Sequence, residues 1–402
     1  MCNTQFLIRS ASLIAKRRYS VRMKPEDTAI LEYPARPDQP ATASLAAARQ
    51  VLDQAVAARA FPGAAFGVIS RNQIAIDAVG RFTYDSNAPA VRPDTVFDIA
   101  SVSKVVATTT AAMILYDRGL LDLDTRVGDI LPGFVVGMEH GSGKDRVTLR
   151  MLLAHNSGLP GYVTFFREHT TPPGLFRAAL HLPLEAQPGT RTEYSDPGYI
   201  LLGKAVEILS GECLDTFCAR EIFTPLRLGN TCFRPPAALR STIPPTEHDT
   251  TFRHRIIQGE VQDENAFVLG GIAGHAGVFS NVRDLLTLAQ CILDQGRTAS
   301  GAQLFTPETL QVFATRHSTP DGKERALGWD VPTPPSSSGR YFGPRSIGHL
   351  GYAGTSIWID PDQSLAIVLL TNRTWPDRSS DAIRQVRPAF HDAVVEALQR
   401  AL

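Results

Sequence analysis

Apolar residues recur with two different spacings along the first part of this chain. The short runs AAFGVIS (64–70) and QIAIDAVG (73–80) are separated by Arg71-Asn72, a break of hairpin length, and they predict two paired strands. Before them, the apolar residues of 45–59 recur with helical spacing and predict a helix.

The pattern changes twice more towards the C-terminus. From Ser101 to about residue 265, helical segments are split by Pro and Gly. Four short apolar runs then predict antiparallel strands, RALGWDV, IGHLGY, TSIWIDP and SLAIVLLTN, and a final helix is predicted from about Ser380 to Leu402. The simplest arrangement is one antiparallel sheet with a mostly helical region, about 105–265, inserted between its two sets of strands. We therefore predict an α+β fold.

Composition and charge exclude several classes of function. The 402 residues include 40 basic and 40 acidic ones, with no basic stripe, so we expect no nucleic-acid partner. No run reaches the roughly 18 apolar residues of a membrane span. The five cysteines are scattered without metal-ligand spacing, so we expect neither a disulfide framework nor a metal site. The chain is long enough for one composite domain or for two.

The N-terminal segment differs from the rest of the chain. MCNTQFLIRSASLIAKRRYSVRMK is basic and has no acidic residue, which is typical of a transit peptide. Alternatively, Met23 is the true start, which would favour the cytoplasm; otherwise the basic segment would direct the protein to an organelle or export it. We therefore treat 1–43, which ends in a Pro-rich linker, as an extension that is a targeting segment or disordered, and 44–402 as the folded domain.

A serine and a lysine stand three places apart where the helical region begins. The segment FDIASVSKVVATTTAAMILYDRGLLDLD (97–124) predicts a helix from Ser101 to Gly119, and Lys104 follows Ser101 by one turn. Residues at i and i+3 share a helix face, so the amine can reach the hydroxyl. A neutral lysine in an apolar pocket can act as the base for a serine nucleophile. An isolated S-x-x-K is common, however, and has little weight alone.

Two further motifs give this pair its weight. TEYSDPGYILLG places Tyr194 and Asp196 at a turn before a helix, and IGHLGYAGTSIWIDP places His349 and Gly351 at a strand edge. The order S-x-x-K, Y-x-D/N, K/H-x-G is that of the penicillin-recognising serine hydrolases.

From about Ser44 to its C-terminus the chain resembles the beta-lactamase-related serine hydrolases, which include class C beta-lactamases, D-alanyl-D-alanine carboxypeptidases and family VIII esterases. The stretches FPGAAFGVIS, LLAHNSGLPGY, DENAFVLGGIAGHAGVFSNVRDLLTLAQ and IDPDQSLAIVLLTNR add to the likeness. The resemblance implies a sandwich of helices and an antiparallel sheet, with a catalytic groove between the sheet and the helical region.

The resemblance also implies a role for each motif residue. Ser101 would be the acylated nucleophile and Lys104 its partner amine. Tyr194 would pass the proton to the leaving group, sharing the base role with Lys104. Asp196 stands where relatives often have Asn. This difference puts the binding of a substrate amide by that side chain in doubt and makes a salt bridge with Lys104 possible.

The third motif departs from the family pattern at one position. His349 replaces the usual lysine, and with an unperturbed pKa near 6.5 it would gain charge between pH 7.5 and pH 5.5. Gly351 would let the substrate lie against the strand. The backbone N–H of Tyr352 would complete an oxyanion hole with that of Ser101.

Other polar residues receive structural interpretations. Ser103 points to another side of the helix than Ser101. His155 and His275 lie in Gly-rich stretches without a zinc pattern, and we interpret both as structural histidines. For Asp263 and Glu264 we favour groove-lining or helix capping over general-base catalysis.

These observations predict a cofactor-free serine hydrolase that acts on a small ester, amide or peptide substrate, with an esterase-like preference. Two alternatives stay open. The first is a peptidoglycan-directed amidase, D,D-carboxypeptidase or beta-lactamase, and the second is a non-catalytic penicillin-binding sensor. Because a scaffold has no need of a buried lysine beside a serine, the intact triplet of Ser101, Lys104 and Tyr194 argues against the sensor. The sequence does not determine the oligomeric state.

Overall fold

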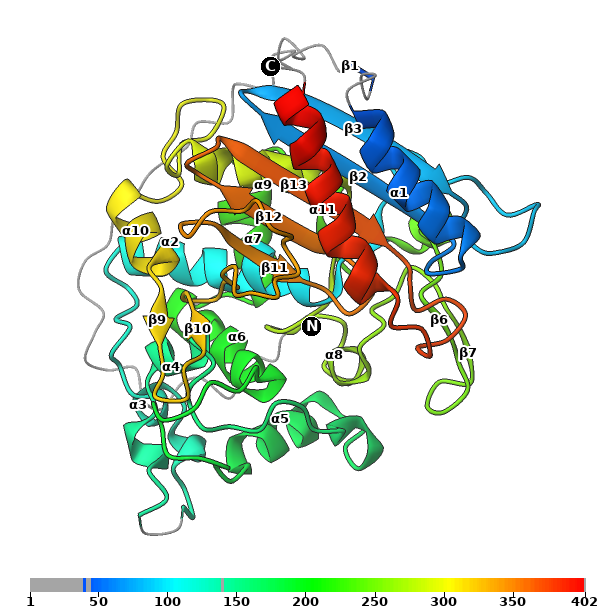
Figure 1. Cartoon of the computed structure of the whole chain (residues 1–402). Helices are drawn as coiled ribbons and strands as arrows, with labels where there is room; N and C mark the ends of the chain where they lie inside the picture. Colours follow the sequence, from blue (N-terminus) through cyan, green and yellow to red (C-terminus); the bar gives the residue numbers. More distant parts are fainter. Residues whose placement is uncertain (1–38, 41–44, 139–140, 401–402) are drawn as a thin grey trace, which may run out of the picture. The chain divides into compact units, whose positions relative to one another are not determined.

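A six-stranded sheet organises the part of the chain that the structure, a computed structural model, describes: residues 39–40, 45–138 and 141–400 (Figure 1). The strands run in the order β1 (Gln39–Pro40), β3 (Gln73–Gly80), β2 (Gly63–Ser70), β13 (Leu365–Thr371), β12 (Ser356–Asp360) and β11 (Ile347–Leu350). Neighbouring strands are antiparallel except β1 and β3, which are parallel. Strands from both ends of the sequence therefore share one sheet, as the apolar pattern predicted.

The sequence of each strand matches its place in the sheet. All seven residues of β13 are buried, and β2 is buried up to Ser70, because both strands lie in the middle of the sheet with helices over both faces. β3 lies nearer the edge and is mostly half-buried. Between β2 and β3, Arg71 and Asn72 both have positive φ angles, 49° and 65°, which is the backbone of a two-residue type I′ hairpin turn.

Two helices from opposite ends of the described chain cover one face of the sheet. Figure 1 shows α1 (Ala46–Ala57) and α11 (Ile383–Arg400) side by side over the strands. They bury a distinct apolar cluster against the sheet, in which the rings of Phe66 and Phe390 meet edge to face with their centroids 5.3 Å apart.

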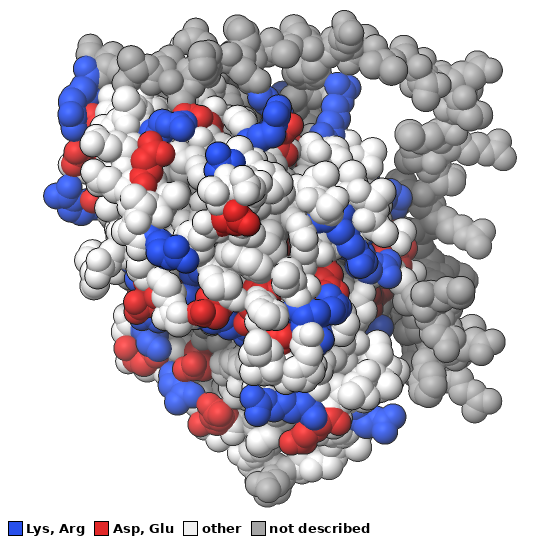
Figure 2. Space-filling model, turned by 90° about the vertical axis from the view of Figure 1, so that its right-hand side faces the viewer, with Lys and Arg blue, Asp and Glu red and all other residues white. Residues whose placement is uncertain are grey.

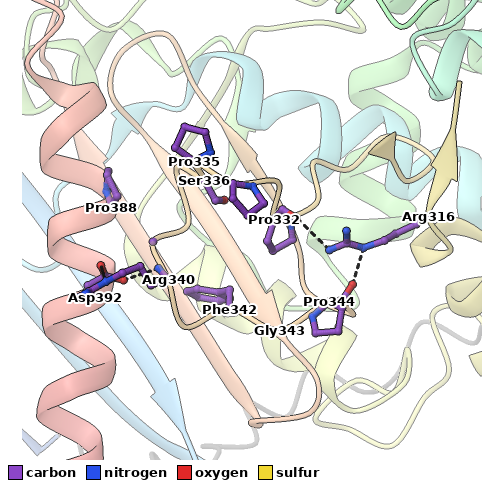
Figure 3. Close-up of a pocket in the computed structure, with 12 residues that line it drawn as sticks. Arg316, Pro332, Pro335, Ser336, Arg340, Phe342, Gly343, Pro344, Pro388 and Asp392 are labelled. Atoms are coloured by element: carbon purple, nitrogen blue, oxygen red, sulfur yellow. Dashed lines mark hydrogen bonds and ion pairs between the residues drawn. The ribbon is translucent and has the colours of Figure 1, made fainter. Parts of the chain in front are cut away.

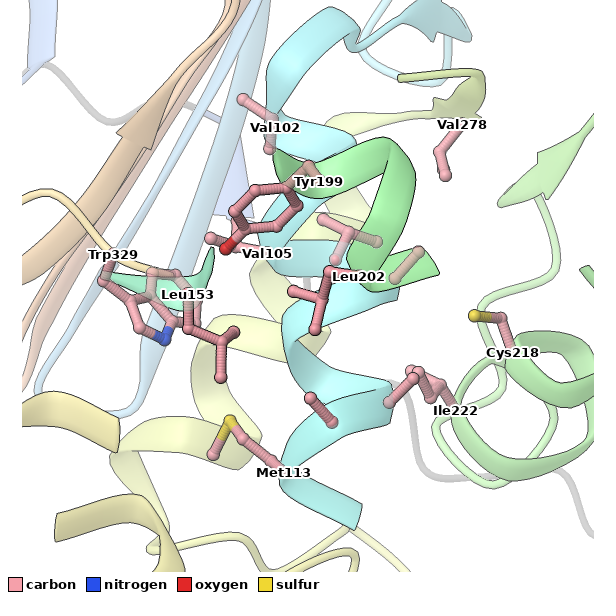
Figure 4. Close-up of a cluster of buried hydrophobic side chains, with 14 of the residues drawn as sticks. Val102, Val105, Met113, Leu153, Tyr199, Leu202, Cys218, Ile222, Val278 and Trp329 are labelled. Carbon is pink, nitrogen blue, oxygen red and sulfur yellow. The ribbon is translucent and has the colours of Figure 1, made fainter. Parts of the chain in front are cut away.

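The opposite face of the sheet packs against the helical region. Its larger cluster surrounds the helix that begins near Ser101, and Figure 4 shows Tyr199 and Leu202 lying against that helix. The helices involved are α2 (Thr110–Asp117), α3 (Val127–Ile130), α4 (Leu149–Leu153), α5 (Pro172–His181), α6 (Asp196–Ser210), α7 (Leu214–Cys218), α8 (Glu264–Val268), α9 (Val282–Leu293) and α10 (Pro307–Ala314). Of these, α9 packs directly on β2 and β13. This packing fixes the start of the helical region against the sheet.

The helical region also contains short strands. A three-stranded sheet contains β4 (Phe97–Asp98), β8 (Val278–Ser280) and β5 (Cys232–Phe233), and two hairpins contain β6 (Glu247–Asp249) with β7 (Arg255–Ile257) and β9 (His317–Ser318) with β10 (Glu324–Arg325). Because β4 ends three residues before Ser101, its pairing with β8 holds that serine beside the glycine-rich segment around residue 275.

The structure corrects one strand prediction and shortens another element. In RALGWDV only the first residue belongs to a strand, β10, and Trp329 is instead buried in the core, where apolar burial requires no strand. The final helix begins at Ile383 rather than Ser380. The predicted N-terminal extension lies outside the described residues, apart from the two residues of β1.

Charged side chains of both signs alternate over the face shown in Figure 2, without a broad patch of one sign. This face therefore supplies no long-range field to attract a charged ligand. In the described part of the chain, no helix has both the length and the apolar character needed to cross a membrane.

Candidate active site

A sharp turn carries the chain from β4 into the helix of Ser101. Ala100 has a positive φ of 49°, a strained conformation for an L-residue with a side chain, and a 3₁₀ turn follows over Ala100–Val102. The carboxylate of Asp98 holds this turn, because it accepts hydrogen bonds from Ala100 N and Gln262 N, both at 2.8 Å. Burial raises the pKa of Asp98 to about 6, although both hydrogen bonds oppose the rise. The turn places Ser101 at the start of the helix, where its side chain is partly buried, whereas the residues that follow it are fully buried.

Lys104 is fully buried one turn after Ser101. Its Nζ lies 3.1 Å from Ser101 Oγ, 3.0 Å from the carbonyl oxygen of His275, and 2.7 Å from Oδ1 of Asp196 in an ion pair. An ammonium has three N–H bonds, so it has one acceptor within reach for each.

The charges around Lys104 determine its protonation state. Burial by itself would lower the pKa of Lys104, but Asp196 and Tyr194 outweigh burial and raise the pKa above its ordinary value. The hypothesis of a neutral lysine in an apolar pocket is therefore wrong for the free protein. The salt bridge to Asp196, which the sequence left open, is present.

Tyr194 lies over this lysine. Its ring centroid is 4.8 Å from Lys104 Nζ and 4.6 Å from the ring of His155. The buried hydroxyl interacts with Lys104 and Ser101, although it makes no well-aligned hydrogen bond to a described residue. Burial raises the pKa of Tyr194, and Lys104 acts in the opposite direction. A phenol in this state is a proton donor.

His155 supports the turn that carries Tyr194 and Asp196. Its Nδ1 accepts the backbone N–H of Ser195 at 2.9 Å. Ser195 in turn caps α6, with its Oγ accepting from Gly198 N at 3.0 Å. These contacts agree with the structural role predicted for His155.

His275 and Asp263 form a pair that the sequence did not reveal. His275 Nε2 lies 2.8 Å from Asp263 Oδ1, and Asp263 also caps α8 by accepting from Ala266 N at 2.7 Å. Burial would raise the pKa of Asp263, but His275 and the hydrogen bonds lower it to about 2. The capping role was predicted, whereas no local pattern signals the contact with His275. Its effect is to fix the loop whose carbonyl holds Lys104.

The third motif differs from its predicted role. His349 on β11 is 1% exposed, its Nδ1 is 2.8 Å from Leu350 O, and it is absent from the lining of the cavity beside Ser101. Burial lowers the pKa of His349 to about 4. The expectation that this histidine gains charge between pH 7.5 and pH 5.5 is therefore wrong, because it is neutral throughout that range.

Gly351 is required by the protein's own packing. A Cβ at this position would lie 1.9 Å from Thr355 Oγ1 and 2.6 Å from Ile99 O. The glycine therefore lets the end of β11 approach the segment that carries Ser101. The next residue, Tyr352, is half-exposed and lines the cavity.

A cavity of about 370 Å³ opens beside Ser101. It is lined by Asp98, Ala100, Ser101, Tyr162, Tyr194, Asp196, Val261, Gln262, Asp263, Glu264, His275, Ala276, Tyr352 and Arg378. Of the predicted residues, Ser101, Tyr194, Asp196 and Tyr352 meet here, while Lys104 lies beneath them and His349 does not reach the cavity.

Arg378 lines the cavity, although no pattern in the sequence predicted this position for it. Its guanidinium pairs with Glu247 Oε2 at 2.6 Å and with Glu264 Oε1 at 2.7 Å. Burial would lower the pKa of Arg378, but the two glutamates raise it above the ordinary value. Because both partners are acidic, this arginine leaves no uncompensated positive charge at the cavity wall.

A second cavity, of about 590 Å³, is larger but lacks this chemistry (Figure 3). Prolines line much of it, and its two arginines are engaged: Arg340 pairs with Asp392 at 2.9 Å, and Arg316 donates to Pro344 O at 2.6 Å. The smaller cavity is the candidate active site, because it contains a serine hydroxyl beside a buried amine.

Comparison with known proteins identifies the family of the chain. A family model described as Beta-lactamase matches residues 48–389. An N-acetylmuramyl-L-alanine amidase of Bacillus subtilis (strain 168) is 33% identical over 363 residues, covering 81% of this chain and 80% of the relative. A putative D-alanyl-D-alanine carboxypeptidase of Escherichia coli (strain K12) is 33% identical over 309 residues, covering 69% of each chain.

Solved structures bear out the predicted α+β fold. EstCE1, described as a hydrolase with promiscuous acyltransferase activity, superposes with a TM-score of 0.71 at 22% identity, over 88% of this chain and 98% of EstCE1. A beta-lactamase from Sulfitobacter sp. EE-36 superposes with a TM-score of 0.69 at 23% identity, over 90% of this chain and 99% of that one. At these identities the likeness concerns the fold.

The charge on Asp196 should govern the pH at which Ser101 becomes reactive. A raised pKa keeps Lys104 protonated to higher pH, so the rate of Ser101 labelling by a fluorophosphonate should climb from pH 6 to pH 10 by up to about tenfold per pH unit. In Asp196→Asn the counter-charge is lost while burial remains, which lowers the pKa of Lys104 and moves the rise to lower pH.

The matched control is Glu264→Gln, which removes a carboxylate that pairs with Arg378 instead of Lys104. Its pH curve should follow that of the wild type. Superimposable curves for the wild type and Asp196→Asn would show that the ion pair does not govern the reactivity of Ser101.

Proposed function

The chain belongs to the beta-lactamase family of serine hydrolases, and we propose that it hydrolyses small ester or amide substrates through an acyl-enzyme on Ser101. The observation that carries the proposal is the 3.1 Å contact between Ser101 Oγ and the buried Nζ of Lys104, beside the ion pair with Asp196. A buried amine at a serine hydroxyl is a general base once it has lost its proton.

In the first step, the fraction of Lys104 that has lost its proton at the working pH takes the proton of Ser101, and Oγ forms a bond to the carbonyl carbon of the substrate. Tyr194 donates its phenolic proton to the leaving oxygen or nitrogen as that bond breaks. The ammonium of Lys104 then returns a proton to the Tyr194 oxygen. In the second step, water loses a proton to Lys104 and attacks the acyl carbon, and Ser101 leaves and regains its proton.

Two backbone N–H groups would stabilise the negative oxygen formed in each step. The carbonyl of Ala100 accepts the N–H of Ser103, so the trans peptide directs the N–H of Ser101 out of the helix end. The second donor is the N–H of Tyr352, on the turn that follows β11.

Charge at the cavity supports a neutral substrate. Four carboxylic acid side chains line the cavity, Asp98, Asp196, Asp263 and Glu264, and Arg378 is already paired. With His349 buried and neutral, no lining residue offers a free positive charge to a substrate carboxylate. This favours esters and uncharged amides over beta-lactams and peptide C-termini.

A peptidoglycan amide is the second candidate. It is favoured by the 33% identity to an N-acetylmuramyl-L-alanine amidase over most of both chains. The bond cleaved would also be an amide, so the same residues would act in the same steps.

Labelling should identify the nucleophile. A fluorophosphonate should modify Ser101, and Ser101→Ala should abolish the labelling, because the Ser101 hydroxyl lies 3.1 Å from the amine of Lys104. Ser103→Ala is the matched control and should keep most of it, since Ser103 Oγ is buried and accepts from Val278 N at 3.0 Å. An adduct mapped by mass spectrometry to Ser103 would refute the assignment.

The buried state of His349 predicts that this histidine causes no change in substrate preference between pH 5.5 and pH 7.5. p-Nitrophenyl butyrate should be hydrolysed faster than a chromogenic cephalosporin at pH 7.5. The pH dependence of the ratio of their kcat/KM values should be the same within about twofold in the wild type and in His349→Ala down to pH 5.5, because a histidine with a pKa of about 4 stays neutral over that range. Asp98, which lines the cavity and has a pKa of about 6, titrates in both enzymes alike. The ratio cancels the titration of Lys104 and Tyr194, which both reactions share.

His349→Lys supplies a comparison with a permanent charge at the same position. A ratio that shifts toward the cephalosporin by tenfold or more as the wild type is acidified, but not as His349→Ala is acidified, would show that His349 does titrate against the substrate. A faster reaction with the cephalosporin or with a muramyl peptide would favour the second candidate.

A further inference from the structure

Two buried arginines hold the turn that follows β11. Arg387, on α11, is 7% exposed and Arg373, just after β13, is 9% exposed. Arg387 donates from Nη2 to Gly351 O at 2.6 Å and to Thr355 O at 2.9 Å, and from Nε to Gly354 O at 3.2 Å.

Arg373 binds the remaining carbonyls of the same turn. Its Nε donates to Tyr352 O at 2.7 Å and its backbone N–H to Ala353 O at 3.0 Å, while its guanidinium lies 4.4 Å from the centre of the Tyr352 ring. All five carbonyls from Gly351 to Thr355 therefore have a donor from Arg373 or Arg387.

Burying Arg387 in this arrangement is unfavourable for the stability of the fold. In the described part of the chain, every acceptor that Arg387 contacts is a main-chain carbonyl, and no carboxylate forms an ion pair with it. Burial lowers the pKa of Arg387 to about 9, and the nearby charge of Arg373 adds to that effect. The charge of Asp330 opposes this decrease but forms no direct ion pair with Arg387. A buried cation without an ion-pair partner costs several kcal/mol in general.

The contacts of Arg387 fix the orientation of one peptide group, the one that joins Gly351 and Tyr352. The cis bonds among the described residues precede Pro335 and Pro376, so the peptide joining Gly351 and Tyr352 is trans. In a trans peptide the C=O and the N–H point in opposite directions. Because Arg387 holds the Gly351 carbonyl towards α11, the Tyr352 N–H is directed away from α11.

The turn also touches the segment that carries the nucleophile. Thr355 Oγ1 donates to Ile99 O at 2.9 Å, two residues before Ser101, and Gly351 packs closely enough against Ile99 to exclude a Cβ. The N–H that faces away from α11 therefore lies on the Ser101 side of the turn, where the Tyr352 side chain lines the cavity.

We propose that Arg387 and Arg373 are positioning residues that fix the Tyr352 N–H as an oxyanion donor by holding the carbonyls on the other side of the turn. The positive charge at the Gly351 carbonyl also polarises the shared peptide and strengthens its N–H as a donor. The inference rests on the proposed acylation of Ser101, and it adds residues that contact neither the substrate nor Ser101.

The test compares Arg387→Met, Arg387→Lys and the control Arg384→Met, which removes an exposed arginine from the same helix. Arg387→Met should lower kcat/KM for p-nitrophenyl butyrate on the order of 10²-fold, through kcat, with KM within about twofold, because an oxyanion donor acts in the transition state. Arg387→Lys keeps the charge but not the planar fork, and should recover part of the loss. Arg384→Met should match the wild type.

Binding of phenylboronic acid, which forms a tetrahedral adduct on a reactive serine, separates positioning from general damage. Its affinity should fall in Arg387→Met by the same factor as kcat/KM. A loss of folded protein would lower the active fraction without changing the dissociation constant of the remainder.

Several outcomes would overturn the inference. One is a folded Arg387→Met enzyme with kcat/KM within threefold of the wild type, and another is a loss in kcat with unchanged boronate affinity. If Arg387→Met does not fold, the result for Arg387→Lys is decisive. Wild-type kcat/KM and boronate affinity in that variant would contradict the proposed role of the planar guanidinium. If wild-type Ser101 is neither acylated nor labelled, the proposed function fails instead.

Discussion

The site depends on one buried charge, the ammonium of Lys104. Moving an ammonium out of water costs several kcal/mol unless other groups compensate it. Here the compensation comes from three parts of the chain: Ser101 on its own helix, Asp196 at the start of α6, and the carbonyl of His275 in the glycine-rich loop. Each of these segments is fixed by a capping or carboxylate contact of its own. The need to compensate the charge of Lys104 therefore brings the three segments together at the centre of the helical region.

The sheet contributes the other side of the site. Gly351 lets the end of β11 reach Ile99, and Asp98 holds the strained Ala100 that begins the turn into the helix. The position of Ser101 is thus determined from both sides. Strain in the backbone and buried cations around Gly351–Thr355 are unfavourable for stability, and the large core beneath the sheet offsets them.

The sequence predicted the parts of this protein that are encoded locally. The hairpin at Arg71-Asn72, the strands β11 to β13 and the S-x-x-K pair follow from spacing and turn residues, and the structure contains them. The contact of Lys104 with the His275 carbonyl joins residues 171 positions apart, and no local pattern encodes it. The burial of His349 was missed for a related reason, because a polar residue in a strand edge motif does not reveal which elements cover it. Arg387 lies in a helix whose pattern predicts only that one face packs on the sheet, so its contacts with the turn could not be foreseen.

The most direct test of this account is the protonation state of Lys104 itself. The chain has six lysines, so the Cε and Nζ resonances of a protein labelled with ¹³C,¹⁵N-lysine can be resolved. The resonance that is lost in Lys104→Arg is assigned to Lys104. The account predicts that the Lys104 resonance keeps the chemical shift of an ammonium beyond pH 10.5, the ordinary pKa of the side chain. A Lys104 resonance that titrates below that value, and is neutral at pH 8, would contradict it.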